Sequence, residues 1–357
     1  MEEKAKRGST AALPYRSLFW PVALITLGVV MLLFQAGILT PQSIGALLQL
    51  WPLILVAIGI DIVFGRQSPN RGAIIGLGTA AVALALMFVG PAFGLGAAYA
   101  QQDDKVSAAV DGAEVYNVEL DMNSGTINVG ALPSESGDLI QGDLQYYGEL
   151  IFEVQGETER DIRLDTRSIF PFLSTEPTEW DVQLNPDLDL DLLLDLNSGT
   201  VNADLSDHRL NALEIDLNSG DMTADLPQRE ATMDLIVDLN SGDVNVNIPD
   251  GATLDVPIID VNSGTVILTL GENVAIDGEI DLNSGVVTLD VPDDAAVRLN
   301  VEDMNSGSVE LPSDYTMVRE GDDPEDGEGV WESPNAADAM RVIEFRMDIN
   351  SGNVVVR

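Results

Sequence analysis

The sequence contains no cysteine and a single histidine, His208. Without cysteine the chain can form neither disulfides nor thiolate zinc sites, and it has no cysteine nucleophile. One imidazole leaves little for histidine metal clusters or for a Ser-His-Asp triad, because both need histidine beside further partners. These absences argue against the commonest metal and nucleophilic chemistries.

Basic residues are also scarce, since 17 Lys and Arg stand against 59 Asp and Glu. The imbalance lies in residues 101–357, which hold 11 basic and 56 acidic side chains, a net charge of −45. Such a surface repels nucleic acid, because it has no basic stripe with which to displace counterions. It also repels an anionic bilayer face unless cations intervene.

Charge is absent altogether from two long stretches, 17–60 and 72–102. A helix needs about 20 apolar residues to cross a bilayer core. The sequence therefore predicts a transmembrane region over 17–100 with three spans. The spans fall at about 18–39, 46–64 and 72–89. Asp61 lies near the end of the second span, where its carboxylate is expected to reach the interface rather than form an ion site.

Basic residues are distributed unevenly around these spans. All six that precede position 101 lie in segment 1–16 or between spans two and three: Lys4, Lys6, Arg7, Arg16, Arg66 and Arg71. Positive segments stay in the cytoplasm, so 1–16 is predicted to be a cytoplasmic tail. Three spans then place everything after Gln101 outside the cytoplasm, in a multi-pass protein of the cell membrane. The stretch GAAYAQQ (96–102) would also suit signal-peptide cleavage, but two longer spans precede it.

The motif Asp-x-Asn-Ser-Gly occurs eight times after the spans. Its asparagines are Asn123, Asn197, Asn218, Asn240, Asn262, Asn283, Asn305 and Asn350. Five of the seven gaps are 21 or 22 residues, and the other two, 74 and 45, are near multiples of that period. An exact repeat of this length is typical of architectures that stack one small unit on the next.

Apolar and polar residues alternate on both sides of the motif. Leu213, Ile215 and Leu217 precede one copy, and Met222, Ala224 and Leu226 follow it. Period two on either side of a turn predicts strand–turn–strand. One such hairpin cannot bury its apolar face, whereas stacked copies can. Residues 101–357 are therefore predicted to form an all-β, right-handed β-solenoid with 21–22-residue coils, inward Ile215 and outward Thr223. Antiparallel meanders and propellers also place a repeated turn at one edge.

Two segments interrupt the period. Residues 134–190 read as strands with longer loops, and 313–338 are acidic and rich in Gly and Pro, which predicts a mobile loop. The chain then returns to one strand–turn–strand at 341–357, which is expected to pair with the last coil and end the solenoid.

Two features resemble known families. WPVALITLG (20–28) and WPLILVAIG (51–59) share Trp-Pro, then six residues, then Gly, and this pair resembles the LiaI/LiaF-type transmembrane region of bacterial envelope-stress proteins. The run 180–227 and the terminal RVIEFRMDINSGNVVVR resemble the C-terminal domain of LiaF-like proteins, within the broader toastrack group of adhesin-like proteins. The resemblance implies a membrane-tethered β-solenoid without catalytic residues.

Carboxylates are the groups most able to carry chemistry. Those that open the motif are Asp121, Asp195, Asp216, Asp238, Asp260, Asp281, Asp303 and Asp348. In a solenoid they stack about 4.8 Å apart and repel by about 0.9 kcal/mol each in water. Each Asp is expected to brace its own turn through hydrogen bonds to turn N–H groups; calcium bridging is the alternative. Asp207-His208-Arg209 breaks the repeat, but it is expected to be a loop between coils rather than a site.

No catalytic, cofactor-binding or metal-binding residues are predicted, and no P-loop, dinucleotide-binding or His-Glu-x-x-His motif is present. A glycan-cleaving β-helix is disfavoured, because an active site needs residues that break the repeat. Two functions remain open: sensing or regulating envelope stress through a membrane or cell-surface protein partner, or a structural or adhesive surface module that binds cations. The sequence does not indicate an oligomeric state.

Overall fold

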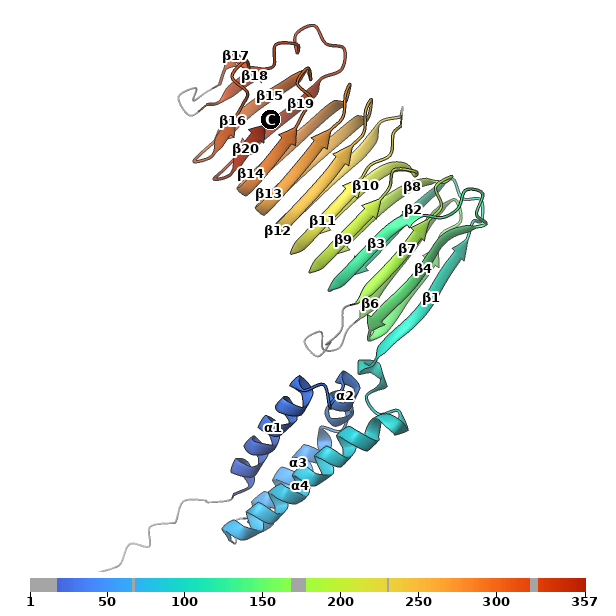
Figure 1. Cartoon of the computed structure of the whole chain (residues 1–357), viewed down its shortest axis with the longest axis vertical. Helices are drawn as coiled ribbons and strands as arrows, with labels where there is room; N and C mark the ends of the chain where they lie inside the picture. Colours follow the sequence, from blue (N-terminus) through green and yellow to red (C-terminus); the bar gives the residue numbers. More distant parts are fainter. Residues whose placement is uncertain (1–17, 66–67, 168–177, 230, 322–326) are drawn as a thin grey trace, which may run out of the picture. The chain divides into compact units, whose positions relative to one another are not determined.

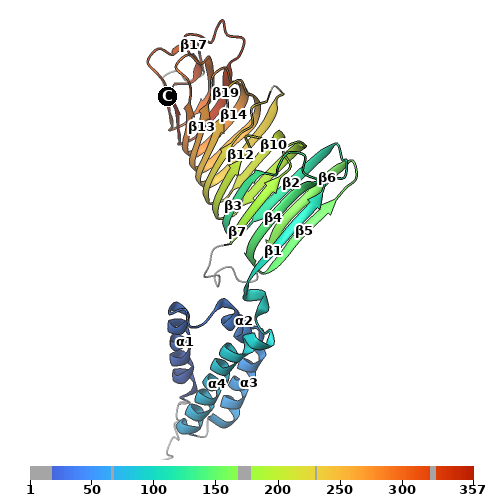
Figure 2. The same cartoon turned by 45° about the vertical axis from the view of Figure 1, so that its right-hand side comes forward.

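The structure is a computed structural model that describes residues 18–65, 68–167, 178–229, 231–321 and 327–357. The chain divides into a helical unit, which ends at Ala100, and a strand unit, which begins at Gln101. The predicted cytoplasmic tail, 1–16, lies outside the described residues. Figure 1 and Figure 2 show the two units from two directions.

The helical unit consists of short apolar helices. They are α1 (Phe19–Gln35), α2 (Pro41–Gln49), α3 (Pro52–Phe64), α4 (Pro69–Val89) and two 3-10 turns, η2 (Gly90–Phe93) and η3 (Ala97–Tyr99). Proline stands at the start of α2, α3 and α4, where its missing N–H costs nothing. The Thr40 hydroxyl accepts a hydrogen bond from the Ser43 N–H (3.3 Å), which caps α2. Helix α4 packs against each of the other three helices.

The helices differ from the three predicted spans. Within the described residues, Asn70–Phe93 is long and apolar enough to cross a membrane, whereas α1, at 17 residues, is apolar but shorter. Helices α2 and α3 pass that test together, but they are bent by 58° at their junction. The predicted span 46–64 is thus two helices, because Pro52 lacks the N–H that would continue α2.

The outer surface of the helical unit is apolar. Leu24, Ile25, Leu32 and Ile74 are each about two-thirds exposed, an arrangement that suits lipid rather than water. Asp61 departs from its prediction: it is 2% exposed and so lies inside the unit, not at its outer surface.

The strand unit contains twenty strands within the described residues. They are β1 (Gln101–Ala109), β2 (Val115–Met122), β3 (Gly125–Ala131), β4 (Asp138–Tyr147), β5 (Glu149–Gln155), β6 (Glu159–Arg167), β7 (Glu179–Leu184), β8 (Asp189–Leu196), β9 (Gly199–Asp204), β10 (Arg209–Leu217), β11 (Gly220–Asp225), β12 (Met233–Ile248), β13 (Thr253–Leu270), β14 (Ala275–Asp290), β15 (Val297–Met304), β16 (Ser308–Glu310), β17 (Thr316–Glu320), β18 (Gly329–Glu332), β19 (Ile343–Ile349) and β20 (Asn353–Val356).

Parallel pairing arranges most of these strands in two layers. The first layer, before the Asn-Ser-Gly turns, runs β6, β2, β8, β10, the first halves of β12, β13 and β14, then β19 and β15. The second layer, after the turns, runs β7, β3, β9, β11, the second halves of β12, β13 and β14, then β20 and β16. The pairing is β-solenoid-like, and it contradicts an antiparallel meander.

Side chains from both layers meet in one hydrophobic core. Leu213, Ile215 and Leu217 of β10 are buried, as are Met222 and Ala224 of β11. The outward neighbours between them are polar. The predicted strand–turn–strand and its inward face are therefore confirmed here.

The two interrupting segments do not leave the stack. Strands β6 and β7, within 134–190, pair in parallel with β2 and β3 although no Asn-Ser-Gly joins them. Segment 313–338, predicted to be a mobile loop, contains β17 and β18, which pair antiparallel with each other and add to β15. Residues 322–326 lie outside the described residues.

The end of the chain does not end the stack. Strands β19 and β20 lie between β14 on one side and β15 and β16 on the other. The prediction that 341–357 closes the solenoid is therefore wrong: β15 and β16 take that place. At the opposite end β2 and β3 similarly lie inside the later strands β6 and β7. Antiparallel strands then extend both ends (Figure 1).

Candidate functional site

The Asn-Ser-Gly turns stack along one side of the strand unit. Their glycines allow it, as Gly220 shows: its φ is 140°, and a Cβ there would lie 2.1 Å from the Gly199 carbonyl oxygen. Any larger residue would push adjacent turns apart. The turns consequently follow one another at strand spacing, and equivalent side chains of successive repeats become neighbours.

Six motif asparagines form a continuous hydrogen-bonded row, the Asn row. Each side-chain Nδ2 donates to the Oδ1 of the asparagine in the preceding turn. The bonds are Asn218 to Asn197 (2.6 Å), Asn240 to Asn218 (2.8 Å), Asn262 to Asn240 (3.0 Å), Asn283 to Asn262 (3.0 Å) and Asn350 to Asn283 (3.0 Å). An amide carries both donor and acceptor, so identical amides can bond one another without end.

Nine aspartates form a second row beside it, the Asp row. In strand order they are Asp165, Asp121, Asp195, Asp216, Asp238, Asp260, Asp281, Asp348 and Asp303. Eight of them open the sequence motif. Asp165 was missed because no Asn-Ser-Gly follows it, although the alternation in RDIRLDTR (160–167) marks the same kind of strand.

The Asp row has acidic neighbours and few partners. Partial burial, then nearby carboxylates, raises the pKa of Asp195 to about 6. Burial likewise raises the pKa of Asp216 and Asp260, with Asp238 adding to the effect on both. A carboxylate is an acceptor without a donor, so stacking it costs energy that stacking an amide does not.

The expected bracing of each turn by its own Asp is not observed. Within the described chain, no hydrogen bond or ion pair joins the carboxylates of Asp216, Asp238, Asp260 or Asp281 to another group. The turns are instead held by the Asn row. The central part of the Asp row is left facing solvent with its charge uncompensated.

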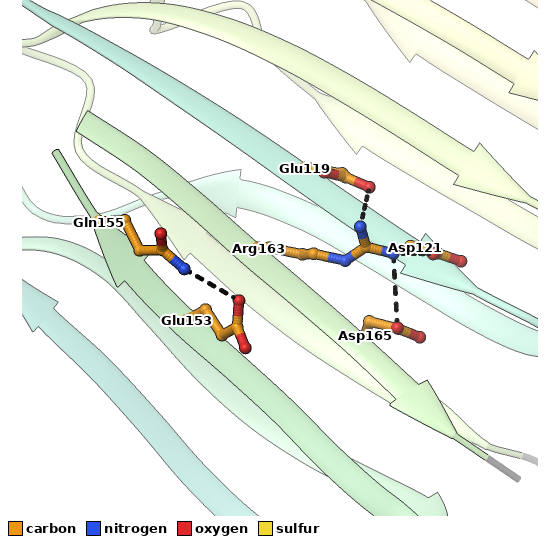
Figure 3. Close-up of polar contacts among 6 residues, drawn as sticks. All are labelled: Glu119, Asp121, Glu153, Gln155, Arg163 and Asp165. Atoms are coloured by element: carbon orange, nitrogen blue, oxygen red, sulfur yellow. Dashed lines mark hydrogen bonds and ion pairs between the residues drawn. The ribbon is translucent and has the colours of Figure 1, made fainter. Parts of the chain in front are cut away.

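One end of the Asp row is partly compensated by Arg163 of β6 (Figure 3). Its guanidinium lies 2.9 Å from Asp121, 3.5 Å from Asp165 and 3.4 Å from Glu119. These carboxylates, Glu119 foremost, raise the pKa of Arg163. Burial and Asp165 still raise the pKa of Asp121, against the lowering effect of Arg163. The row thus has a compensated end and an uncompensated middle.

The two rows line an open groove of about 620 Å³. Its walls are the side chains of Asp216, Asp238, Asp260, Asp281, Asn218, Asn240, Asn262, Asn283 and Asn350. Carboxylates and carboxamides can bind cationic or hydrogen-bonding ligands along the groove. Among the residues that the structure describes, no three His, Asp or Glu side chains are grouped to hold a metal ion.

Asp207 and His208 lie in the turn between β9 and β10, as expected, whereas Arg209 is the first residue of β10. His208 is nevertheless buried, with 3% of its surface exposed. Burial lowers its pKa. No pattern in the sequence marks this burial, which keeps the single imidazole of the chain out of the groove.

Two family models match the chain. Residues 18–63 match the LiaI-LiaF-like transmembrane region, and residues 97–248 match the N-terminal domain of toast_rack. The second match begins just before β1 and ends with β12.

Two solved structures are also similar. One is a "putative cell adhesion protein" from Clostridium sporogenes ATCC 15579, with 16% identity and a TM-score of 0.39, covering 72% of this chain and 100% of that one. The other is a "Putative lipid binding protein" from Parabacteroides distasonis ATCC 8503, with 12% identity and a TM-score of 0.28, covering 72% and 96%. No curated protein matches the chain. The two family matches make the chain similar to proteins that join a LiaI-LiaF-like transmembrane region, which anchors the chain in the membrane, to a toast-rack domain.

Proposed function

We propose that this protein is a non-catalytic component that senses or regulates cell-envelope stress, acting by binding through its toast-rack domain outside the cytoplasm. The observation that carries the proposal is the presence, in one chain, of a LiaI-LiaF-like transmembrane region and a toast-rack domain. The membrane region supplies a surface for lateral contact with a membrane protein partner, and the strand unit supplies the surface that meets the envelope.

The groove supports a binding role. Its side chains are carboxylates and carboxamides repeated from turn to turn, so it presents an extended surface rather than a unique reaction centre. Nucleophilic catalysis needs a nucleophile held beside a base. The imidazole of His208 is buried away from the groove.

Topology is part of the proposal. α1, the bent α2–α3 pair and α4 each cross the membrane, so the N-terminus is cytoplasmic and the strand unit extracytoplasmic. The distribution of Lys4, Lys6, Arg7, Arg16, Arg66 and Arg71 supports this orientation. A reporter that works only outside the cytoplasm should be active when fused after Arg357 and silent when fused after Gln67. The reverse pattern would refute the orientation.

The geometry of the strand unit is also proposed in finer detail: a right-handed β-solenoid with coils of 21–22 residues. The parallel registers Asp195 to Asp216 and Asp216 to Asp238 support that coil length. Right-handed crossovers between parallel strands are the strong general preference. An experimental structure of the strand unit would decide the handedness.

A groove variant tests the sensing role. Replacing Asp216, Asp238 and Asp260 together with Asn keeps side-chain shape but removes three charges from the groove, so we expect an altered transcriptional response to a cell-wall antibiotic. The matched control replaces Asp221 and Asp243 with Asn, on the outer face of the second layer. Wild-type response in both variants would contradict the proposed role of the groove. A purified protein that cleaved a polysaccharide would instead establish an enzyme.

A structural or adhesive surface module with bridging cations is the second candidate. The uncompensated carboxylates of the central Asp row favour it, because hard oxygen ligands suit Ca²⁺. Millimolar Ca²⁺ should then raise the unfolding temperature of the wild type and leave that of the Asp216, Asp238, Asp260 triple Asn variant unchanged. An equal response in both proteins would count against bridging in the groove.

A further inference from the structure

The stack of strands has four edges in the described chain, and three of them carry features that hinder pairing with another chain. Exposed edges offer unpaired N–H and C=O groups to other chains, and proteins block them with charge, bulges, proline or short strands. Strand β1 carries Asp103, Asp104 and Lys105 in succession and shifts register at Ala108. Strand β16 has three residues, with Pro312 just beyond. Strand β17 shifts register between Met317 and Arg319.

The fourth edge, β5, has no bulge and no proline, and its two charges, Glu149 and Glu153, both lie on the outer side of the strand. Its seven residues, ELIFEVQ, pair with β6 without a register shift, from Glu149 opposite Arg167 to Gln155 opposite Asp161. No other strand of the described chain pairs with β5. It contains neither proline nor lysine. It is a regular edge of the first layer, at the end of the stack where β1 also lies.

The apolar side chains of β5 are incompletely covered. Leu150, Phe152 and Val154 pack against the end of the core but remain only half-buried. Within the core, by contrast, Leu164 of β6 and Phe345 of β19 are fully buried. The core is thus still open on the β5 side, where one more strand would cover it.

We propose that β5 is a self-association edge, at which β5 of one copy pairs antiparallel with β5 of a second copy around Phe152. This pairing sets Phe152 against its equivalent and Leu150 against Val154 of the other copy, all on the core side. On the outer side, Ile151 meets Glu153, and Glu149 meets Gln155. No two carboxylates stand directly opposite each other. A two-fold axis relates the two copies, so each copy makes the same contacts as the other.

Basic residues on β6 reduce the charge repulsion that a second acidic copy meets at this end. Three of the eleven basic residues of 101–357 lie on β6 alone: Arg160, Arg163 and Arg167. Arg160 and Arg163 form ion pairs with Asp111, Glu119 and Asp121. Repulsion between two copies is therefore smaller here than along the central Asp row, where no base compensates the carboxylates.

The membrane anchor reduces what the strands must supply. A seven-residue strand pair buries less surface than a stable interface between freely diffusing proteins needs, about 1,200 Å² or more. Copies held in one membrane meet at a high effective concentration, so a smaller interface is enough. The association is expected in membranes and weaker in dilute detergent.

Cysteine cross-linking of the full chain tests the register, because the natural sequence has no cysteine. Differently tagged Ile151→Cys and Glu153→Cys copies are expressed together, and membranes are oxidised. The two positions face each other in the proposed pair, within disulfide reach, whereas equivalent positions lie too far apart. The mixed pair should cross-link about tenfold more than either variant alone. Figure 3 shows Glu153 beside Gln155 on β5.

The matched control uses Thr316→Cys with Glu320→Cys, which would face each other in a pair of β17 edges. Equal cross-linking there, or no excess in the mixed β5 pair, overturns the proposal. Ile151→Glu, which sets a second carboxylate opposite Glu153 of the other copy, should abolish co-purification of two tagged copies from membranes, and Val318→Glu on β17 should not. Undiminished co-purification of the Ile151→Glu protein also overturns it.

Discussion

The Asp row and the Asn row occupy the same turns, two residues apart, and respond to repetition in opposite ways. Each added asparagine gains a hydrogen bond of 2.6–3.0 Å with its neighbour. Each added aspartate brings another negative charge beside the last, and partial burial with these neighbours raises several carboxyl pKa values. Stacking stabilises an amide row and destabilises a carboxylate row.

The comparison separates two roles within one motif. The Asn row and the glycines account for the geometry of the turns. The Asp row adds nothing that holds the turns together in its central part, so its retention in every repeat points to a role on the outside of the molecule. Four changes test this division, from the largest expected effect to the smallest.

Placing a carboxylate in the Asn row should be the most damaging change. In Asn240→Asp the side chain can no longer donate to Asn218, and a new charge lies between existing ones. We expect the free energy of unfolding to fall by about 2–3 kcal/mol, measured from the urea midpoint of the β-sheet circular dichroism. Asn245→Asp, on the outer face of β12, is the control and should change it little. Equal losses of stability in the two variants would mean that the hydrogen bonds of the Asn row do not stabilise the protein more than other outer side chains do.

Acidification should stabilise the strand unit. The carboxyl pKa values of Asp121, Asp195, Asp216, Asp260 and Asp348 are raised by burial and neighbouring acids, that of Asp195 to about 6 from 3.8. The folded state then holds protons that the unfolded state has lost. This stabilisation is complete below about pH 4 and disappears as the pH rises through about 6.

We therefore expect the free energy of unfolding, measured by urea denaturation, to be higher at pH 5 than at pH 7.5 by about 1–2 kcal/mol. His208 acts in the opposite sense, because its lowered pKa removes stability as the pH falls below about 6.5. A His208→Leu variant should consequently show a steeper gain on acidification than the wild type. A midpoint that falls in that variant would contradict the charge assignment.

Removing one charge from the Asp row should stabilise the protein at pH 7. Asp195→Asn keeps the shape of the side chain and relieves repulsion from Asp121 and Asp216, so the gain should be about 1 kcal/mol after solvent screening. Asp204→Asn is the opposite control, since the Ser206 hydroxyl donates to that carboxylate at 2.6 Å and lowers its pKa. Its stability should fall, and a gain in both variants would show a non-specific effect of net charge.

Loss of the compensating base should have the smallest effect. Arg163→Gln leaves Glu119, Asp121 and Asp165 without their common partner, but the site is partly exposed, so the expected loss is below about 1 kcal/mol. A titration followed by NMR should show the pKa of Asp121 rising further. Arg346→Gln, whose 3.7 Å ion pair with Asp277 is more exposed, should leave stability and titration unchanged.

Much of the strand unit follows from its sequence, because alternation and exact repetition are local signals. Ile215 inward and Thr223 outward needed only period two around Asn218. The order of the strands in the stack could not be predicted from the sequence, because the strands of any repeat can pair in parallel with those of any other. Nothing in 341–357 shows that it enters between β14 and β15 rather than joining the end.

The groove was only partly foreseeable. The stacking of eight aspartates follows from their spacing, whereas Asp165 and Arg163 lie outside the motif and enter the Asp row through a strand that lacks it. The bracing of turns by Asp was wrong because the prediction overlooked that asparagine can satisfy itself along the stack. The break between α2 and α3, in contrast, is marked in the sequence by Pro52, although the apolar run continues through it.

The position of β19 and β20 inside the stack bears on how the protein is made. A repeat domain can in principle fold unit by unit as the chain emerges from the ribosome or the translocon. Here the place between β14 and β15 stays vacant until residues 343–356, which are made after both of those strands, arrive to fill it. The pairing around β15 is therefore completed only after residue 356 has emerged. A nascent chain stalled at residue 340 should show this as protease sensitivity at β15 that disappears when the chain is extended past residue 356.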